Sequence, residues 1–195
     1  EGVKAQKVNV VENGILENFL MSRAPVGEFN KSNGHGRTAA GGIPVSRQSN
    51  LIIKSSDPVS ENELRKLLIK ECKRQKKEYG YLFENVEGGY TNTARFSPNA
   101  FNIFPTEVYR IYVDGRPDEL VRGVNLIGTP LSMFAEVEAA AEKSEIFIGM
   151  CGAESGSVPV SVACPSIFVK RIETQKSMKE NLEKKILPSP SIEQN

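Results

Sequence analysis

A cysteine between two glycines, where a tight loop runs into an apolar strand, constrains this chain more than any other feature. Gly149 and Gly152 flank Cys151, and the alternating residues Val158 and Val160 follow shortly after. Glycine lets the backbone adopt positive φ angles and lets a second group approach closely. We therefore expect the thiol of Cys151 to be presented to a ligand or a partner rather than packed away.

The residues alone leave three roles open for Cys151. A thiolate is a good zinc ligand, and catalytic zinc commonly has three protein ligands and an open water position. A cysteine nucleophile would need a base, and the only histidine is His35. The third role is that of a small residue packed near a turn. Cys72 is expected to pack in the core and Cys164 to pack or to lie at a strand edge, and an odd total of three cysteines argues against a disulfide framework.

Composition narrows the class of protein. The 195 residues suffice for one well-cored domain or two small ones. The net charge of +1 gives no electrostatic case for nucleic acid or a membrane surface as partner. No apolar run approaches the roughly 20 residues that span a bilayer. Since Glu1 is not a methionine, we expect residues upstream of it, and the cysteine usage favours a reducing, cytoplasmic location.

Hydrophobic periodicity predicts an α+β fold, mostly antiparallel sheet in a curved or barrel-like sandwich, with two or three helices. Asn13-Gly14 predicts a tight hairpin turn. Ser60 and Glu63 have the spacing of a capping box, so a helix is expected from there to a stop at Gly80. A second helix is expected over the alanine-rich residues 132–143. The strands are expected at residues 8–11, 15–21, 50–54, 81–86, 90–96, 100–104, 107–113, 120–127, 145–150, 158–163 and 166–172.

Two segments are candidates for contacts with an extended peptide. The loop Asn33-Gly34-His35-Gly36-Arg37 could line a groove, with Arg37 meeting a carboxylate or carbonyl, or it could be a polar surface turn. Pro159 cannot donate to a sheet ladder, which favours an edge strand over residues 157–163. A peptide can add to such an edge through main-chain hydrogen bonds. If the chain binds an extended peptide, Asn33, His35, Arg37, Val158 and Val160 are the residues expected to contact it.

Several of these motifs together resemble the C-terminal domain of the TldD/PmbA proteins, which are also catalogued as modulators of DNA gyrase. The resemblance spans about residues 3–172. It is carried by residues 10–23, by residues 33–37 followed by Ser49-Asn50-Leu51, by residues 121–128, and by Cys151-Gly152 with Ser157-Val158-Pro159-Val160 and Pro165. Residues 1–175 are therefore expected to form this domain. The charged tail, residues 176–195, is expected to hold a short docking helix and then disorder.

The resemblance implies a zinc-dependent metallopeptidase that hydrolyses peptides and pairs two related subunits. In the TldD branch, two histidines of an H-E-x-x-x-H helix and the late cysteine hold zinc, and the glutamate acts as general base. Cys151 stands at that cysteine, whereas the helical motif lies upstream of this segment in the family. The chain would thus supply one zinc ligand and part of the peptide groove, contain no catalytic residue, and be inactive alone.

The resemblance also implies the partners: the upstream region of the same protein, a TldD- or PmbA-like subunit in a homo- or heterodimer, and an extended peptide. The chain departs from the family after Cys151, where Ala153, Ser155 and Gly156 replace a basic residue and a Gly-Gln pair. The alternative function is a non-catalytic, PmbA-like partner or scaffold subunit. The lysines of the first helix carry no aromatic interleaving, so DNA binding is not expected.

Overall fold

The computed structural model describes residues 1–24, 26–48, 50–94 and 96–177. The chain divides into two compact units, each assembled from two segments. The first consists of Glu1–Val59 and Ala140–Ser166, and the second of Ser60–Ala139 and Ile167–Asn195, of which the structure describes residues up to 177. No helix in these described ranges is long and apolar enough to cross a membrane.

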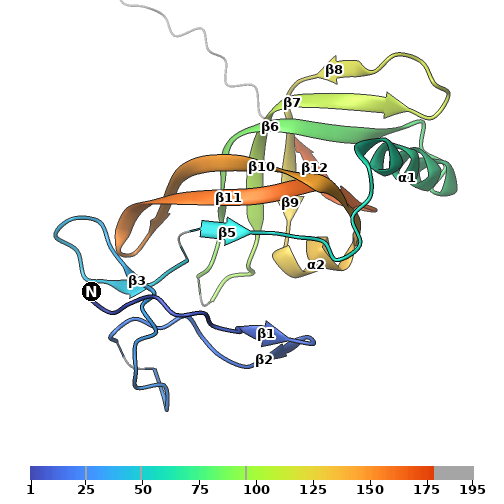
Figure 1. Cartoon of the computed structure of the whole chain (residues 1–195). Helices are drawn as coiled ribbons and strands as arrows, with labels where there is room; N and C mark the ends of the chain where they lie inside the picture. Colours follow the sequence, from blue (N-terminus) through green and yellow to red (C-terminus); the bar gives the residue numbers. More distant parts are fainter. Residues whose placement is uncertain (25, 49, 95, 178–195) are drawn as a thin grey trace, which may run out of the picture. The chain divides into compact units, whose positions relative to one another are not determined.

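The first unit is built on a long hairpin. Strands β10 (Val137–Ala153) and β11 (Gly156–Val169) are joined by a short turn, and β5 (Asn50–Ile52) pairs in parallel with β11, which gives the order β10-β11-β5 (Figure 1). Two smaller antiparallel pairs accompany this sheet. They are formed by β1 (Val11–Glu12) with β2 (Ile15–Leu16) and by β3 (Gly36–Arg37) with β4 (Val45–Ser46).

The second unit holds a five-stranded sheet and two helices. Its strand order is β12-β9-β7-β6, with β8 paired to β7 (Figure 1). These strands are β6 (Tyr79–Thr91), β7 (Phe101–Tyr112), β8 (Glu119–Val121), β9 (Val124–Gly128) and β12 (Glu173–Lys176). The side chains of Val108 and Ile111 on β7 are fully buried and form the centre of its core.

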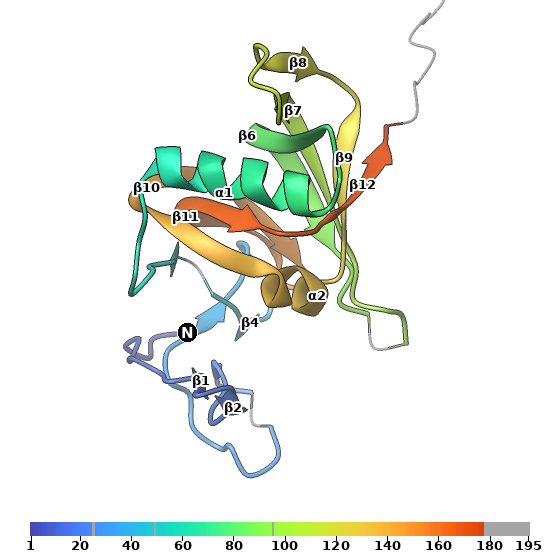
Figure 2. The ribbon, with the colours of Figure 1, turned by 90° about the vertical axis from the view of Figure 1, so that its right-hand side faces the viewer.

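Helix α1 (Glu61–Arg74) begins as the sequence predicts. Ser60 is its N-cap, and its hydroxyl accepts a hydrogen bond from the Glu63 amide at 3.2 Å. Leu64 and Cys72 are buried, and Figure 2 shows α1 beside β6. The α+β class, with mostly antiparallel sheet and two helices, is thus confirmed, and the described strands form open sheets rather than a closed barrel.

The predicted stop of this helix at Gly80 is wrong. The helix ends at Arg74, Lys76 adopts a φ of 57°, and the amide of Lys77 donates to the Cys72 carbonyl at 2.8 Å. This is a Schellman ending with lysine at the position that usually holds glycine. Gly80 lies instead in β6, where an added Cβ would come within 2.5 Å of Leu68 Cδ1. Its small size serves the close approach of helix and strand.

The predicted second helix over residues 132–143 is wrong in its larger part. Helix α2 (Pro130–Ala135) starts at the Thr129 N-cap and is short, and β10 begins at Val137. The backbone of Val59 pairs with the first part of this strand. Its amide donates to the Ala140 carbonyl at 3.0 Å, and its carbonyl accepts from the Glu142 amide at 3.1 Å. Ala141 is buried here, so tertiary pairing has overridden the helix propensity of alanine.

Other predicted strands merge or stop early. The four strands expected between residues 81 and 113 form the two long strands β6 and β7, and the hairpin at Asn13-Gly14 is present but short, with φ angles of 50° and 81° at its turn. The boundary expected at residue 175 stays a prediction, although β12 runs across it. The docking helix and disordered end expected in the tail lie outside the described residues, apart from their first positions.

Candidate functional site

The hairpin of β10 and β11 carries Cys151 close to its turn. Glu154 and Ser155 form the turn, and Gly156 follows with a φ of +86°. An added Cβ on Gly156 would lie 2.6 Å from the Ala39 Cβ, so both the backbone angle and the space require glycine. The loop that holds Ala39 is tied to the same turn, because the Ala39 amide donates to the Ser155 carbonyl at 2.9 Å. A turn next to the cysteine is therefore observed, but Cys151 and its flanking glycines Gly149 and Gly152 lie within β10, before the turn, rather than in the loop that the sequence predicts.

Cys151 differs from the other two cysteines in accessibility. All three thiols are free, but Cys72 is buried and Cys164 is half-buried, whereas Cys151 is exposed. Burial raises the pKa of the Cys72 thiol, and burial likewise raises the pKa of Cys164. Because a metal is held by the thiolate, a raised pKa disfavours those two as ligands. Cys151 is thus the cysteine whose thiol a ligand can reach.

Arg47 is a second component of this site, and no pattern in the sequence indicates its role. The side chain is buried, with 8% of its surface exposed. Its Nη2 donates to the Cys151 carbonyl at 2.5 Å, and its Nη1 donates to the Gly156 carbonyl at 2.6 Å and to the Ser155 hydroxyl at 3.1 Å. These partners lie 104 to 109 residues away along the chain, so no local motif could have predicted the contact.

The residues predicted to line a groove bond within their own loop and to the backbone of residues 19–21. Asn33 Oδ1 accepts from the Met21 amide at 2.7 Å and lies 2.8 Å from His35 Nδ1, and Asn33 Nδ2 donates to the Phe19 carbonyl at 2.9 Å. Arg37 Nη1 donates to the carbonyls of Gly34 and Gly36, each at 2.9 Å. The loop is therefore ordered by these side chains, and their contact with a peptide stays a prediction.

The structure revises the predicted edge strand. Strand β11 lies between β10 and β5, and Ser161–Ala163 pair with Asn50–Ile52, so residues 161–163 are not on an edge. Val158 is buried with 4% of its surface exposed, which puts its side chain in the core, whereas Val160 is half-buried. The edge of this sheet next to the cysteine is instead β10, the strand that carries Cys151.

Strand β10 also presents a run of exposed apolar side chains just before Cys151. Ile146, Phe147, Ile148 and Met150 have between 53% and 78% of their surface exposed. Neighbouring residues in a strand point to opposite faces, so the run is open on both faces of the sheet within the described part of the chain. A contiguous apolar surface of this kind is typical of a segment that another protein surface covers.

The metal-binding capacity of the described residues is limited. Among residues 1–177, leaving out positions 25, 49 and 95, no group of three or more histidine, cysteine, aspartate or glutamate side chains is placed to hold a metal. An exposed thiol fits zinc as one donor, since thiolate is a preferred zinc ligand. Cys151 could therefore serve only as one member of a ligand set completed from elsewhere.

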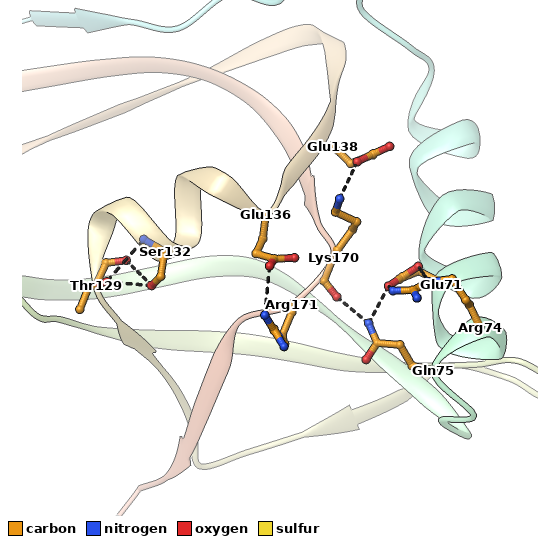
Figure 3. Close-up of polar contacts among 9 residues, drawn as sticks. All are labelled: Glu71, Arg74, Gln75, Thr129, Ser132, Glu136, Glu138, Lys170 and Arg171. Atoms are coloured by element: carbon orange, nitrogen blue, oxygen red, sulfur yellow. Dashed lines mark hydrogen bonds and ion pairs between the residues drawn. The ribbon is translucent and has the colours of Figure 1, made fainter. Parts of the chain in front are cut away.

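A separate polar cluster lies in the second unit and surrounds a hollow of about 340 Å³ (Figure 3). Its side chains pair with one another. The pairs are Arg74 with Glu71 at 2.6 Å, Lys170 with Glu138 at 3.0 Å, and Arg171 with Glu136 at 3.2 Å, and Gln75 Nε2 donates to the Lys170 carbonyl at 3.1 Å. Hydrogen bonds from Arg74 and Gln75 lower the pKa of Glu71 to about 2. Through Gln75, the cluster links the C-terminal end of α1 to the backbone of Lys170. We therefore interpret it as a structural network and not as a reaction site.

Comparison with known proteins gives a consistent result. A family model described as PmbA/TldA metallopeptidase C-terminal domain matches residues 1–176. The chain is 30% identical over 161 residues to a metalloprotease of Methanocaldococcus jannaschii, covering 82% of this chain and 33% of that protein. It is 28% identical over 176 residues to a zinc metalloprotease TldD homolog of Saccharolobus solfataricus, covering 89% of this chain and 36% of that protein. The chain thus spans about a third of the length of these relatives.

Proposed function

The chain belongs to the PmbA/TldA metallopeptidase C-terminal domain family, and on that premise we propose that it is the C-terminal part of a TldD-type zinc-dependent peptidase that hydrolyses peptides. The observation that supports this proposal most directly is the exposed thiol of Cys151 near the turn of the β10–β11 hairpin, whereas the other two cysteines are less accessible. Cys151 would hold zinc as one ligand. The upstream region would supply the remaining ligands and the general base, as the resemblance to the TldD branch implies.

Cys151 and the upstream ligands would hold the zinc, which would supply a bound water of lowered pKa and a Lewis acid for the peptide carbonyl. This chain's own contribution is to place one sulfur ligand and to border the bound peptide. The edge of β10 next to Cys151 has main-chain groups suited to an extended peptide. The Asn33, His35 and Arg37 loop and Val160 are the other proposed contacts, and the buried Val158 would support the strand from the core side. By itself the chain should not hydrolyse peptides.

The exposed run on β10 supports the proposed partners. The relatives are about two and a half times as long as this chain, which supports a whole protein that extends beyond it. We propose that the upstream region of the same protein, together with a second TldD- or PmbA-like subunit, covers Ile146, Phe147, Ile148 and Met150. Burial of such side chains is favourable by about 25 cal/mol per Å² of apolar surface removed from water.

Metal content of the full-length protein tests the proposed function. We expect about one zinc per subunit, a marked loss of zinc in Cys151→Ala, and no change in the matched control Cys164→Ala. Cleavage of an unstructured peptide should fall together with zinc in the first variant. A full-length protein that binds no zinc, or that binds it equally well without Cys151, would contradict the proposal.

The second candidate is a non-catalytic partner subunit of such a peptidase. One observation favours it: the polar side chains of Asn33, His35 and Arg37 are already hydrogen-bonded to one another or to backbone groups of the loop and of Met21, instead of being left open for a peptide. The upstream sequence separates the two functions, because a catalytic subunit requires the H-E-x-x-x-H motif there. A zinc-free subunit that raises the activity of a catalytic partner would establish the scaffold role.

A further inference from the structure

Arg47 is a charged residue with a buried side chain, and its guanidinium donates three hydrogen bonds to acceptors of a single hairpin. A buried charge is tolerated only where hydrogen bonds replace the water that it has lost. Three such bonds are present, from Nη2 to the Cys151 carbonyl and from Nη1 to the Gly156 carbonyl and the Ser155 hydroxyl. Hydrogen bonds from a charged donor are also stronger than neutral ones.

The positions of these acceptors matter. Cys151 belongs to β10, and Ser155 and Gly156 belong to the turn and the start of β11, so one guanidinium bridges both sides of the hairpin. One of its acceptors is the carbonyl of the cysteine itself. Fixing that carbonyl fixes the adjacent Cα, from which the thiol projects.

Arg47 is itself anchored to a different part of the first unit. Its amide donates to the His35 carbonyl at 2.9 Å, and it directly follows β4, where the Ser46 hydroxyl accepts from the Ser22 amide at 2.9 Å. The hairpin is therefore held against the His35 loop rather than left as a free projection.

We propose that Arg47 is a positioning residue for the Cys151 thiolate, acting through the cysteine's own carbonyl, and this inference rests on the proposed function of Cys151 as a zinc ligand. The planar fork of arginine presents two nitrogens at fixed separation, which suits two carbonyls on facing strands. Lysine would keep the positive charge, but its single nitrogen could not bond both carbonyls in the same geometry. Groups that orient a metal ligand commonly change metal affinity by about tenfold to hundredfold when removed.

The test is a thermodynamic cycle on zinc affinity in the full-length protein, measured by competition with a chromophoric chelator. Arg47→Met should weaken zinc binding about tenfold to hundredfold, and the same substitution in a Cys151→Ala background should add little. Arg65→Met is the control, because Arg65 donates two hydrogen bonds to the Asp118 carboxylate and none to the hairpin, and it should leave zinc affinity unchanged.

Two results would overturn the inference. One is a zinc affinity for Arg47→Met that equals that of the unaltered protein. The other is an equal loss in both backgrounds, which would mean a general structural effect. If Cys151→Ala alone leaves zinc affinity unchanged, the proposed function fails and this inference fails with it.

A second measurement needs no zinc, so it tests the positioning role of Arg47 separately from the proposed role of Cys151 as a zinc ligand. In the metal-free full-length protein, Arg47→Lys should speed hydrogen exchange of the amides of residues 151–157 while exchange in the β7 core stays as before. Lysine keeps the charge and is chosen so that the protein still folds. Unchanged exchange in the hairpin would overturn the positioning role, whether or not Cys151 binds zinc.

Discussion

The turn near Cys151 requires a residue without a Cβ at position 156, and the substitution Gly156→Ala measures how much stability depends on that requirement. The new Cβ would stand 2.6 Å from the Ala39 Cβ, whereas carbon atoms in contact normally lie about 3.5–4.0 Å apart. Ala39 cannot relieve the overlap by rotating a side chain, so its backbone must move. That movement would disturb the hydrogen bonds from the Ala39 amide at 2.9 Å and the Thr38 hydroxyl at 3.2 Å to the Ser155 carbonyl.

Two contributions add up to the expected loss of stability. Holding alanine at a φ of +86° costs roughly 1–2 kcal/mol. Overpacking against Ala39 costs about 1–3 kcal/mol more. The free energy of unfolding of the chain, measured by equilibrium urea denaturation, should therefore fall by roughly 2–5 kcal/mol in Gly156→Ala.

Gly41→Ala is the matched control for this experiment. Gly41 lies in the same loop as Ala39 and has a φ of +80°, but an added Cβ there would meet nothing within 4 Å. It should lose only the backbone contribution of roughly 1–2 kcal/mol. Equal losses in the two variants would refute the argument from close contact, and no loss in either would refute the argument from the backbone angle as well.

Two further predictions concern titration and reactivity. Hydrogen bonds from Arg74 and Gln75 depress the folded-state pKa of Glu71 to about 2, so the stabilisation is complete above the unfolded-state value near 4.5 and is lost as the pH falls towards 2. The stability difference between the unaltered chain and Glu71→Gln, followed by urea denaturation, should shrink over that window, and a constant difference would contradict the assigned cause. In the native metal-free chain, alkylation detected by peptide mass mapping should modify Cys151 first and the buried Cys72 last. Faster modification of Cys72 would contradict the assigned burial.

The parts of the fold that could be predicted from the sequence are those specified by neighbours in the chain. Ser60 caps α1 because a hydroxyl can accept from an amide three residues ahead, and Asn13-Gly14 turns because both residues tolerate positive φ. The turn near Cys151 is also a local feature, but Gly156 after it supplies the positive φ, whereas the glycines that flank the cysteine, Gly149 and Gly152, lie within β10. Each of these inferences needs only a few consecutive residues.

The errors arose where a distant segment decides the local structure. The alanines at 139–141 have a high helix propensity, but Val59 forms a parallel β-bridge with Ala141, and this pairing with a distant residue holds the segment as a strand. The expectation of an edge at residues 157–163 likewise depended on one proline. Pairing of residues 161–163 with β5 could be known only once the chain had folded.

Arg47 shows why the support of a site is harder to predict than the site itself. A candidate ligand can be recognised by its chemistry, because few side chains bind zinc. A group that orients the ligand through a main-chain carbonyl can be any donor of sufficient reach, from any part of the chain. Its only distinguishing property is burial of a charge against backbone acceptors, and that property exists only in the folded molecule. Substitutions at Arg47 should therefore separate the placing of the thiol from its chemistry, which substitutions at Cys151 cannot do.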